Sequence, residues 1–192
     1  MRVEIRFAGL GGHGVVFGGR LIGYIASLEG FDASMTVAYS PAQRGGWSVA
    51  DVIISDEEVL YPYVENPDAL LATTQERYEN EVGKVKRGGL VIYEESTVKP
   101  RRGDVLHVGV PAFRLAEERA GSRMFANSFI VGVFLAVTKL APLERGLEAL
   151  EKLGARALEM NKKALEEGYR YGASLGVSVE LFQRTEAAER RH

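Results

Sequence analysis

One segment near the N-terminus, Gly-Leu-Gly-Gly-His-Gly at positions 9–14, constrains the fold of this chain more than any other. Before it, apolar and charged residues alternate over residues 2–7, which is the period of a β-strand. After it, apolar residues recur at helical spacing over residues 15–28, and a second apolar strand is expected over residues 33–39. A strand, a glycine-rich turn, a helix and a strand together predict a βαβ unit.

The rest of the chain continues to alternate strands with helices. Further strands are expected at residues 47–55, 69–74, 89–93 and 105–108, and helices at residues 75–87, 113–120, 126–140 and 143–171, the last divided at Gly154. Because the strand at 47–55 follows another strand without a helix, at least one antiparallel pairing is expected. We predict an α/β fold, a Rossmann-like three-layer sandwich with a mostly parallel sheet and C-terminal helices. Residues 1–177 are expected to form a single domain, and residues 178–192 a charged tail or partner-facing extension.

Composition limits the classes of function that this chain can have. Its 192 residues are 46% hydrophobic and carry a net charge of −2, which favours neither nucleic acid nor an anionic membrane. The absence of cysteine excludes disulfides, thiolate nucleophiles and cysteine-ligated clusters in this polypeptide. His13, His107 and His192 lack the spacing of metal ligands. The longest apolar run, residues 129–137, is far shorter than the roughly 20 residues that span a bilayer. We therefore expect a soluble, cytoplasmic protein without a metal site.

The glycine-rich turn is the first candidate site. Glycine adopts positive φ angles at little cost, and it lets a phosphate approach bare backbone at a helix N-terminus. Gly9, Gly11 and Gly14 fit the pattern Gly-x-Gly-x-x-Gly in the expected strand-to-helix context, with an additional glycine at Gly12. The acidic residue that would bind an NAD ribose is missing, because the second strand ends without Asp or Glu. The turn is either an anion site that does not bind NAD or a tight turn that binds nothing.

Two other segments could complete this site. Arg44, followed by Gly45 and Gly46, lies in a loop at the carboxyl end of a strand, where open α/β sheets bind ligands. Its guanidinium could hold a carboxylate or phosphate, or dock a partner with Trp47 as an anchor; a solvated arginine and a core tryptophan are the alternative. Asn127 begins the most apolar helix, where asparagine most often caps the helix; contact with a ligand or neighbouring chain is the other interpretation.

No catalytic residue stands out. The sequence has no evident Ser/His/Asp or Cys/His arrangement. Glu94 and Glu95 follow a strand, but neighbouring residues on a strand point to opposite faces, so we expect them to be solvated rather than an acid/base pair. Basic residues form no stripe with interleaved aromatic residues, which argues against a nucleic-acid partner.

Taken in order, these motifs resemble the gamma subunit, or gamma domain, of 2-oxoacid:ferredoxin oxidoreductases. The segment at 9–15 is similar to the Gly-x-Gly-Gly-Gln-Gly-Val opening of that family, with His13 in place of the usual glutamine. Arg44-Gly-Gly46 matches its second signature. Weaker similarities follow at residues 52–56, 61–62, 66–71, 88–93, 126–127, 161–164 and 168–169. The resemblance thus covers about residues 1–171.

The resemblance implies an accessory subunit of an enzyme that converts a 2-oxoacid and coenzyme A to acyl-CoA and carbon dioxide while it reduces ferredoxin. Thiamine diphosphate and iron–sulfur clusters would be carried by catalytic alpha and beta subunits and a ferredoxin-like delta subunit. No tightly bound cofactor is expected in this chain, and coenzyme A is the ligand it could contact. The candidate binding residues are Gly9, Gly11, Gly12, His13, Gly14, Arg44, Gly45, Gly46 and Asn127.

The substrate that the resemblance implies is 2-oxoglutarate or a branched-chain 2-oxoacid. One alternative is the small subunit of an indolepyruvate oxidoreductase, whose domain has an Ala-Gln-Arg-Gly-Gly loop like residues 42–46. A second alternative is a stand-alone nucleotide-binding or regulatory module.

Overall fold

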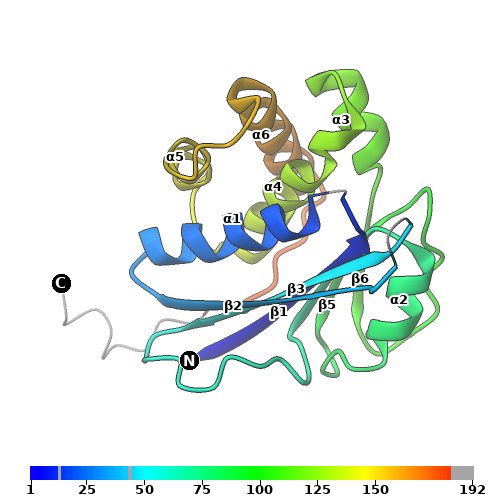
Figure 1. Ribbon diagram of the computed structural model, residues 1–192, viewed down its shortest axis with the longest axis vertical. Helices are drawn as coiled ribbons and strands as arrows, with labels where there is room; N and C mark the ends of the chain where they lie inside the picture. Colours follow the sequence, from blue (N-terminus) through cyan, green and yellow to red (C-terminus); the bar gives the residue numbers. More distant parts are fainter. Residues whose placement is uncertain (13, 43–44, 183–192) are drawn as a thin grey trace.

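The computed structural model describes residues 1–12, 14–42 and 45–182, which form a six-stranded mixed sheet with helices on both faces (Figure 1). The strands are β1 (Arg2–Leu10), β2 (Asp32–Tyr39), β3 (Trp47–Ser55), β4 (Ala69–Ala72), β5 (Leu90–Glu94) and β6 (Leu106–Val110). The helices are α1 (Val15–Leu28), α2 (Gln75–Val82), α3 (Ala112–Ala120), the short 3₁₀ turn η1 (Arg123–Phe125), α4 (Ala126–Thr138), α5 (Leu143–Lys152) and α6 (Leu158–Ser174).

The sheet has the strand order β2-β3-β1-β4-β5-β6. β1, β4, β5 and β6 are parallel, whereas β3 is antiparallel to both of its neighbours, β1 and β2. β1 and β2 therefore run in the same direction, with β3 between them. The predicted α/β sandwich with a mostly parallel sheet is confirmed, and so is the antiparallel pairing expected of residues 47–55. The carboxyl ends of the four parallel strands meet at one edge of the sheet.

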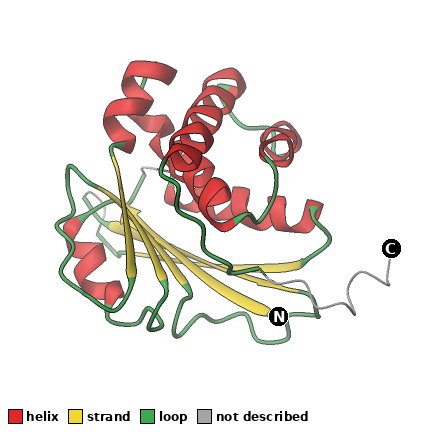
Figure 2. Cartoon of the chain, turned by 180° about the vertical axis from the view of Figure 1, so that it is seen from behind, coloured by secondary structure: helices red, strands yellow, loops and turns green. Residues whose placement is uncertain are grey.

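The two faces of the sheet are covered unequally. Helices α1, α3, α4, α5 and α6 lie on one face and α2 alone on the other, as two opposite views show (Figures 1 and 2). All 13 residues of α4 are buried, as its apolar sequence predicts. The larger apolar core lies between the sheet, α1 and α4.

Helices α4 and α6 pack backbone to backbone at glycine residues. A Cβ atom on Gly168 would lie 2.0 Å from the carbonyl oxygen of Phe129, and one on Gly132 would lie 2.2 Å from that of Leu165. Only glycine allows this approach. The apolar contact also contains a buried hydrogen bond of 2.6 Å from the Ser128 hydroxyl to Asn161 Oδ1.

Two helix boundaries differ from those that the sequence predicts. α2 ends at Val82 instead of residue 87, because the chain turns at Gly83 and buries Val85 under the sheet. α4 ends at Thr138 instead of residue 140, where Lys139 adopts a left-handed conformation with φ 57°. The predicted division of residues 143–171 is confirmed: α5 and α6 are separate helices, and Gly154 has φ 63°.

The segment after α6 returns to the core. The Val179 amide donates to the carbonyl of Val137 at 2.9 Å, and the Phe182 ring lies 6.3 Å from that of Phe31 and 6.4 Å from that of Phe134. The first part of the expected tail thus packs on the domain, and residues 183–192 lie outside the described residues. The domain boundary at residue 177 stays a prediction.

Within the described ranges, no single helix has both the length and the apolar character needed to cross a membrane. Residues 112–120 and 123–138 meet the requirement only as a pair, by length and composition, and the pair is bent by 118°.

Candidate functional site

The glycine-rich turn lies at the carboxyl edge of the sheet, between the end of β1 and the start of α1. Gly14 is the N-cap residue of α1, with φ 79°, and Gly12 has φ 82°. The first turn of α1 contains no acidic residue, and the cap position has no side-chain hydrogen bond. The partial positive charge of this helix end is therefore not offset by a carboxylate in its own first turn.

Two glycines in the turn are needed for close contact rather than for positive φ. A Cβ on Gly9 would lie 2.1 Å from the Thr73 hydroxyl oxygen, and a Cβ on Gly11 would lie 3.0 Å from the Gly46 carbonyl oxygen. Any larger residue would push the turn away from β4 or from the loop before β3. Packing alone thus explains part of the glycine pattern.

The two loops that carry the family-like motifs are hydrogen-bonded to each other. The Gly11 amide donates to the Gly46 carbonyl at 2.7 Å, and Gly45 has φ 67°. The loops are 35 positions apart in the sequence, but pairing of β1 with β3 brings Leu10 opposite Trp47. His13 and Arg44, which the sequence also singled out, belong to these loops and lie outside the described residues.

Asn127 lies against the same turn. It is buried, with 4% of its surface exposed, and its Nδ2 lies 3.0 Å from where a Cβ on Gly14 would be. The N-cap position of α4 is Phe125, so Asn127 lies inside the helix and is not its N-cap residue. Of the predicted residues that the structure describes, the turn glycines, Gly46 and Asn127 are therefore brought together.

Trp47 packs against the smaller apolar core, and its role as a partner anchor stays a prediction. It is half-buried, and the guanidinium of Arg77 lies 4.6 Å from the centroid of its ring. Arg77 is in the first turn of α2, so this cation–π contact joins the start of β3 to the helix after β4.

The sequence interpretation missed Thr73 and Arg77. Both are at least nine-tenths buried, and Thr73 Oγ1 and Arg77 Nε are the buried side-chain polar atoms that lack a hydrogen-bond partner in the described part of the chain. Both follow β4 at the carboxyl edge of the sheet, and Thr73 lies beneath Gly9. A search for polar residues just after each parallel strand would have found Thr73.

The expectation that Glu94 is solvated was wrong. Glu94 is fully buried at the end of β5, whereas Glu95 is exposed. One carboxylate oxygen accepts from the Ser96 amide at 3.0 Å and hydroxyl at 2.7 Å, and the other accepts from the Phe113 amide at 2.8 Å. The carboxylate joins the end of β5 to the start of α3, which is a structural role and not an acid/base one.

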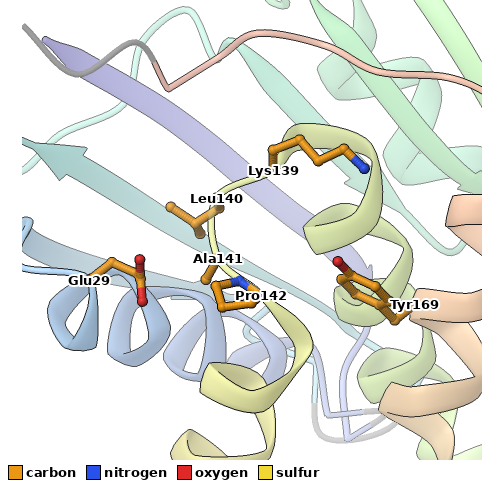
Figure 3. Close-up of a pocket in the computed structure, with 6 residues that line it drawn as sticks. All are labelled: Glu29, Lys139, Leu140, Ala141, Pro142 and Tyr169. Atoms are coloured by element: carbon orange, nitrogen blue, oxygen red, sulfur yellow. The ribbon is translucent and has the colours of Figure 1, made fainter.

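A separate hollow of about 400 Å³ lies at the far end of α1 from Gly14 (Figure 3). It is lined by Glu29, Lys139, Leu140, Ala141, Pro142 and Tyr169. None of these is a residue that the sequence singled out, and Glu29 is paired with Arg145 at 2.9 Å. Nowhere in residues 1–12, 14–42 and 45–182 do three His, Cys, Asp or Glu side chains gather as metal ligands would.

Residues 4–171 match the protein family described as "Pyruvate ferredoxin/flavodoxin oxidoreductase". The chain is 34% identical, over 186 aligned residues, to the 2-oxoglutarate synthase subunit KorC of Methanothermobacter thermautotrophicus, and the match covers 88% of this chain and 98% of that one. It is 33% identical to KorC of Methanocaldococcus jannaschii, over 91% of this chain and 96% of that one.

Solved structures agree with these matches. The gamma subunit of a keto/oxoacid ferredoxin oxidoreductase from Geobacter sulfurreducens is 30% identical with a TM-score of 0.77, and the match covers 90% of this chain and 99% of that one. A 2-oxoglutarate:ferredoxin oxidoreductase from Magnetococcus marinus has the same fold in 33% of its chain, with a TM-score of 0.81 over 96% of this chain at 21% identity. The chain therefore belongs to the pyruvate ferredoxin/flavodoxin oxidoreductase family, as a gamma-type subunit of an oxidoreductase.

Proposed function

We propose that this chain is the gamma subunit of a 2-oxoglutarate:ferredoxin oxidoreductase and that the glycine-rich turn helps to bind coenzyme A. The reaction converts 2-oxoglutarate and coenzyme A to succinyl-CoA and carbon dioxide, and two electrons pass to ferredoxin. The observation that carries the proposal is that Gly11 meets Gly46, and Gly14 meets Asn127, at the N-terminal end of α1. The Magnetococcus marinus enzyme, which shares this fold, was solved with 2-oxoglutarate, coenzyme A and succinyl-CoA bound.

The role of these residues is binding rather than catalysis. Bare backbone at a helix N-terminus suits the phosphate groups of coenzyme A, since the amides donate and the helix dipole favours an anion. A carboxylate in the first turn of α1 would oppose this, and none is present there. The proposed binding residues remain Gly9, Gly11, Gly12, His13, Gly14, Arg44, Gly45, Gly46 and Asn127.

The substrate assignment rests on sequence identity among the relatives whose own length this chain covers almost completely. Subunits named for 2-oxoglutarate synthase are 33–36% identical over most of this chain, whereas those named for pyruvate synthase are 24–27% identical. A branched-chain 2-oxoacid is the second candidate, because a ketoisovalerate oxidoreductase subunit VorA is 38% identical over 136 residues, although the match covers only 28% of that longer chain.

The substrate is tested with the whole complex, purified from its native source through a tag on this chain. We expect reduction of ferredoxin to be fastest with 2-oxoglutarate among 2-oxoglutarate, 2-oxoisovalerate, pyruvate and indolepyruvate. A preference for 2-oxoisovalerate would establish the second candidate, and a preference for indolepyruvate would reject both.

The same purification tests the partners. We propose that catalytic alpha and beta subunits carry thiamine diphosphate, that a ferredoxin-like delta subunit carries iron–sulfur clusters, and that the complex is cytoplasmic. The chain should purify with thiamine diphosphate and with the visible absorption of iron–sulfur clusters. If it purifies alone and calorimetry shows binding of ATP or NAD but not of coenzyme A, it is a stand-alone nucleotide-binding module.

The coenzyme A site is tested by a matched pair of substitutions at Gly12. This residue has φ 82°, and nothing lies within 4 Å of the position that a Cβ atom would take, so asparagine and aspartate are accommodated with equal strain. Gly12→Asp places a negative charge at the proposed phosphate site, and Gly12→Asn does not. We expect the KM for coenzyme A in the complex to rise about tenfold more in the aspartate variant, which corresponds to about 1.4 kcal/mol. Equal KM values for the two variants would exclude a phosphate from this turn.

A further inference from the structure

The outer edge of β2 is unusually open. β2 is the last strand of the sheet and is hydrogen-bonded to β3 alone within the described part of the chain. None of its eight residues is buried, and Val37 and Tyr39 are 36% and 64% exposed. β3, by contrast, has seven buried residues out of nine. The edge thus combines unpaired backbone with exposed apolar side chains.

This edge also lacks the features by which sheet edges usually avoid pairing. Residues 33–39 contain no charged residue and no proline. Their pairing with β3 runs through eight consecutive residues from Asp32 to Tyr39 without a bulge. The other edge strand, β6, has only five residues and includes His107 and Gly109. A long, regular, uncharged edge is a template for another strand.

We propose that β2 pairs with β2 of a second copy of this chain, in antiparallel orientation about a two-fold axis perpendicular to the sheet. The backbone is arranged for this. The Ser40 amide donates to the Trp47 carbonyl at 2.8 Å, so by the alternation of an antiparallel ladder the even-numbered residues of β2 bond to β3. The amides and carbonyls of Ala33, Met35, Val37 and Tyr39 consequently point outward.

One register uses all of these outward groups, and it is centred on Thr36. Met35 of each copy then faces Val37 of the other, and Ala33 faces Tyr39, which gives about eight backbone hydrogen bonds. These four side chains lie on the face covered by α1, because they share the direction of Met35, whose sulfur approaches Gly19 of α1. Each exposed side chain, Val37 or Tyr39, thereby meets an apolar partner.

The charges favour a second copy over a partner of different chemistry. The single charged residue of β2, Asp32, lies at its end, where its carboxylate accepts from the Val59 amide at 2.7 Å. No like charges within β2 oppose each other in the two-fold register, and Thr36 meets Thr36 on the opposite face. A strongly charged segment would find no complementary charge along residues 33–39. An isologous contact needs only this self-complementary strand.

The oligomeric state of the full chain, measured by sedimentation equilibrium, is the first test. We expect a dimer for the wild type, a monomer for Val37→Lys, and a dimer for the control Leu106→Lys, which places the same charge on the exposed Leu106 of β6. Thermal unfolding confirms that both variants are folded. A monomeric wild type, or dissociation by Leu106→Lys but not by Val37→Lys, would overturn the proposal. Hydrogen exchange gives a further test. If the Met35 and Val37 amides are protected only when the catalytic subunits are present, the edge of β2 binds those subunits and the proposal is overturned.

The register is tested by disulfide cross-linking. The chain has no cysteine of its own, so an introduced cysteine can form a disulfide only with its copy. Thr36→Cys would face itself in a non-hydrogen-bonded pair, where Cα atoms are about 4.5 Å apart and a disulfide fits. Ser34→Cys would lie four residues from its copy, about 13 Å away. We expect oxidation to give a covalent dimer with Thr36→Cys and none with Ser34→Cys. Equal cross-linking of the two variants would show contact without this register and would refute it.

Discussion

Neighbouring residues of β1 point to opposite faces of the sheet, and the two faces are stabilised by different kinds of interaction. Phe7 points to the face covered by α1 and is fully buried against Gly18, whose Cβ would lie 2.4 Å from the ring. Arg6 points to the face covered by α2 and is also buried, with 8% of its surface exposed. One face is held by apolar packing and the other by a charge network.

Each of the three nitrogens of the Arg6 guanidinium has a hydrogen-bond partner. Its guanidinium donates to both carboxylate oxygens of Asp51 at 2.7 Å, to Glu81 at 2.7 Å and to the Val64 carbonyl at 3.0 Å. The hydrogen bond to Asp51 is the largest cause of the raised pKa of Arg6. Burial opposes ionisation of Glu81, but hydrogen bonds and charge from Lys84 and Arg6 outweigh it and lower the pKa of this carboxyl.

The difference follows from how much each helix layer covers. Helices α1, α3, α4, α5 and α6 lie on the α1 side of the sheet, and the core on that side is apolar. The other face has the eight-residue α2 and loops, and Glu4 of β1 and Asp51 of β3 are only partly buried. A buried charge is tolerated there only because each partner is present, since an unpaired one would cost several kcal/mol.

The largest expected effect is at Phe7. Phe7→Ala should lower the free energy of unfolding by about 3–5 kcal/mol, because it leaves a cavity against α1. The loss should be the same at low and high salt, since no charge is involved. Urea denaturation at two ionic strengths measures it. A loss below about 1 kcal/mol would show that the α1 face can collapse around the missing ring.

Arg6→Met should cost about 3 kcal/mol, because Asp51 and Glu81 are then buried without their shared cation. Unlike the loss at Phe7, this one should depend on pH. The lowered pKa of Glu81 gives stability that is present above its ordinary value of 4.5 and disappears as the pH falls through the folded value. The difference in stability between wild type and variant should therefore shrink as the pH falls below 4.5 through the folded pKa of Glu81. A constant difference between pH 7 and pH 3 would contradict this account.

Two glycine substitutions are expected to change the free energy of unfolding by intermediate amounts. Gly168→Ala should cost about 1–3 kcal/mol, because its Cβ would overlap the Phe129 carbonyl in the α4–α6 contact. Gly83→Ala, just after α2, meets nothing within 4 Å and has φ −62°, so it should be neutral or stabilise by up to about 1 kcal/mol. Thermal unfolding of the two variants compares the tight face with the open one. Equal losses of stability in the two variants would contradict the expected difference between the α4–α6 contact and the turn after α2.

The smallest effect concerns His107 on the α2 face. The Tyr78 hydroxyl accepts from the Arg101 and Arg102 amides, so its own proton is donated to His107 Nε2 at 3.0 Å. Burial, and then the charge of Arg102, lower the pKa of His107 below 6.5. Its contribution to stability is therefore present above pH 6.5 and is lost as the pH falls through the folded value.

His107→Gln should flatten the dependence of stability on pH between about 7 and 5, with little change at about pH 7.5. Denaturation midpoints across this range measure it, and Phe7→Ala serves as a control whose slope should match the wild type. An unchanged slope in His107→Gln would assign the pH dependence to other groups.

Much of the fold could be predicted because it depends on local patterns. The all-apolar sequence of α4 indicates burial on every side, and its 13 residues are buried. The end of α2 could not be predicted, because Lys84, Lys86 and Arg87 favour a helix on the surface. In the structure, burial of Val85 under the sheet outweighs this preference. The burial of Arg6 could not be predicted either, since its partners Asp51 and Glu81 are 45 and 75 positions away.

The candidate site, too, has some features set by the local sequence and others set only by tertiary contacts. By itself the sequence determined where the turn must be and that glycine must occupy it, because positive φ at Gly12 and Gly14 is a local steric requirement. Only the tertiary structure decided that Gly46 and Asn127 meet this turn, that Thr73 lies beneath Gly9, and that Glu94 is buried. These contacts depend on strand order and register, which are selected by the burial of the whole core and not by the residues that touch.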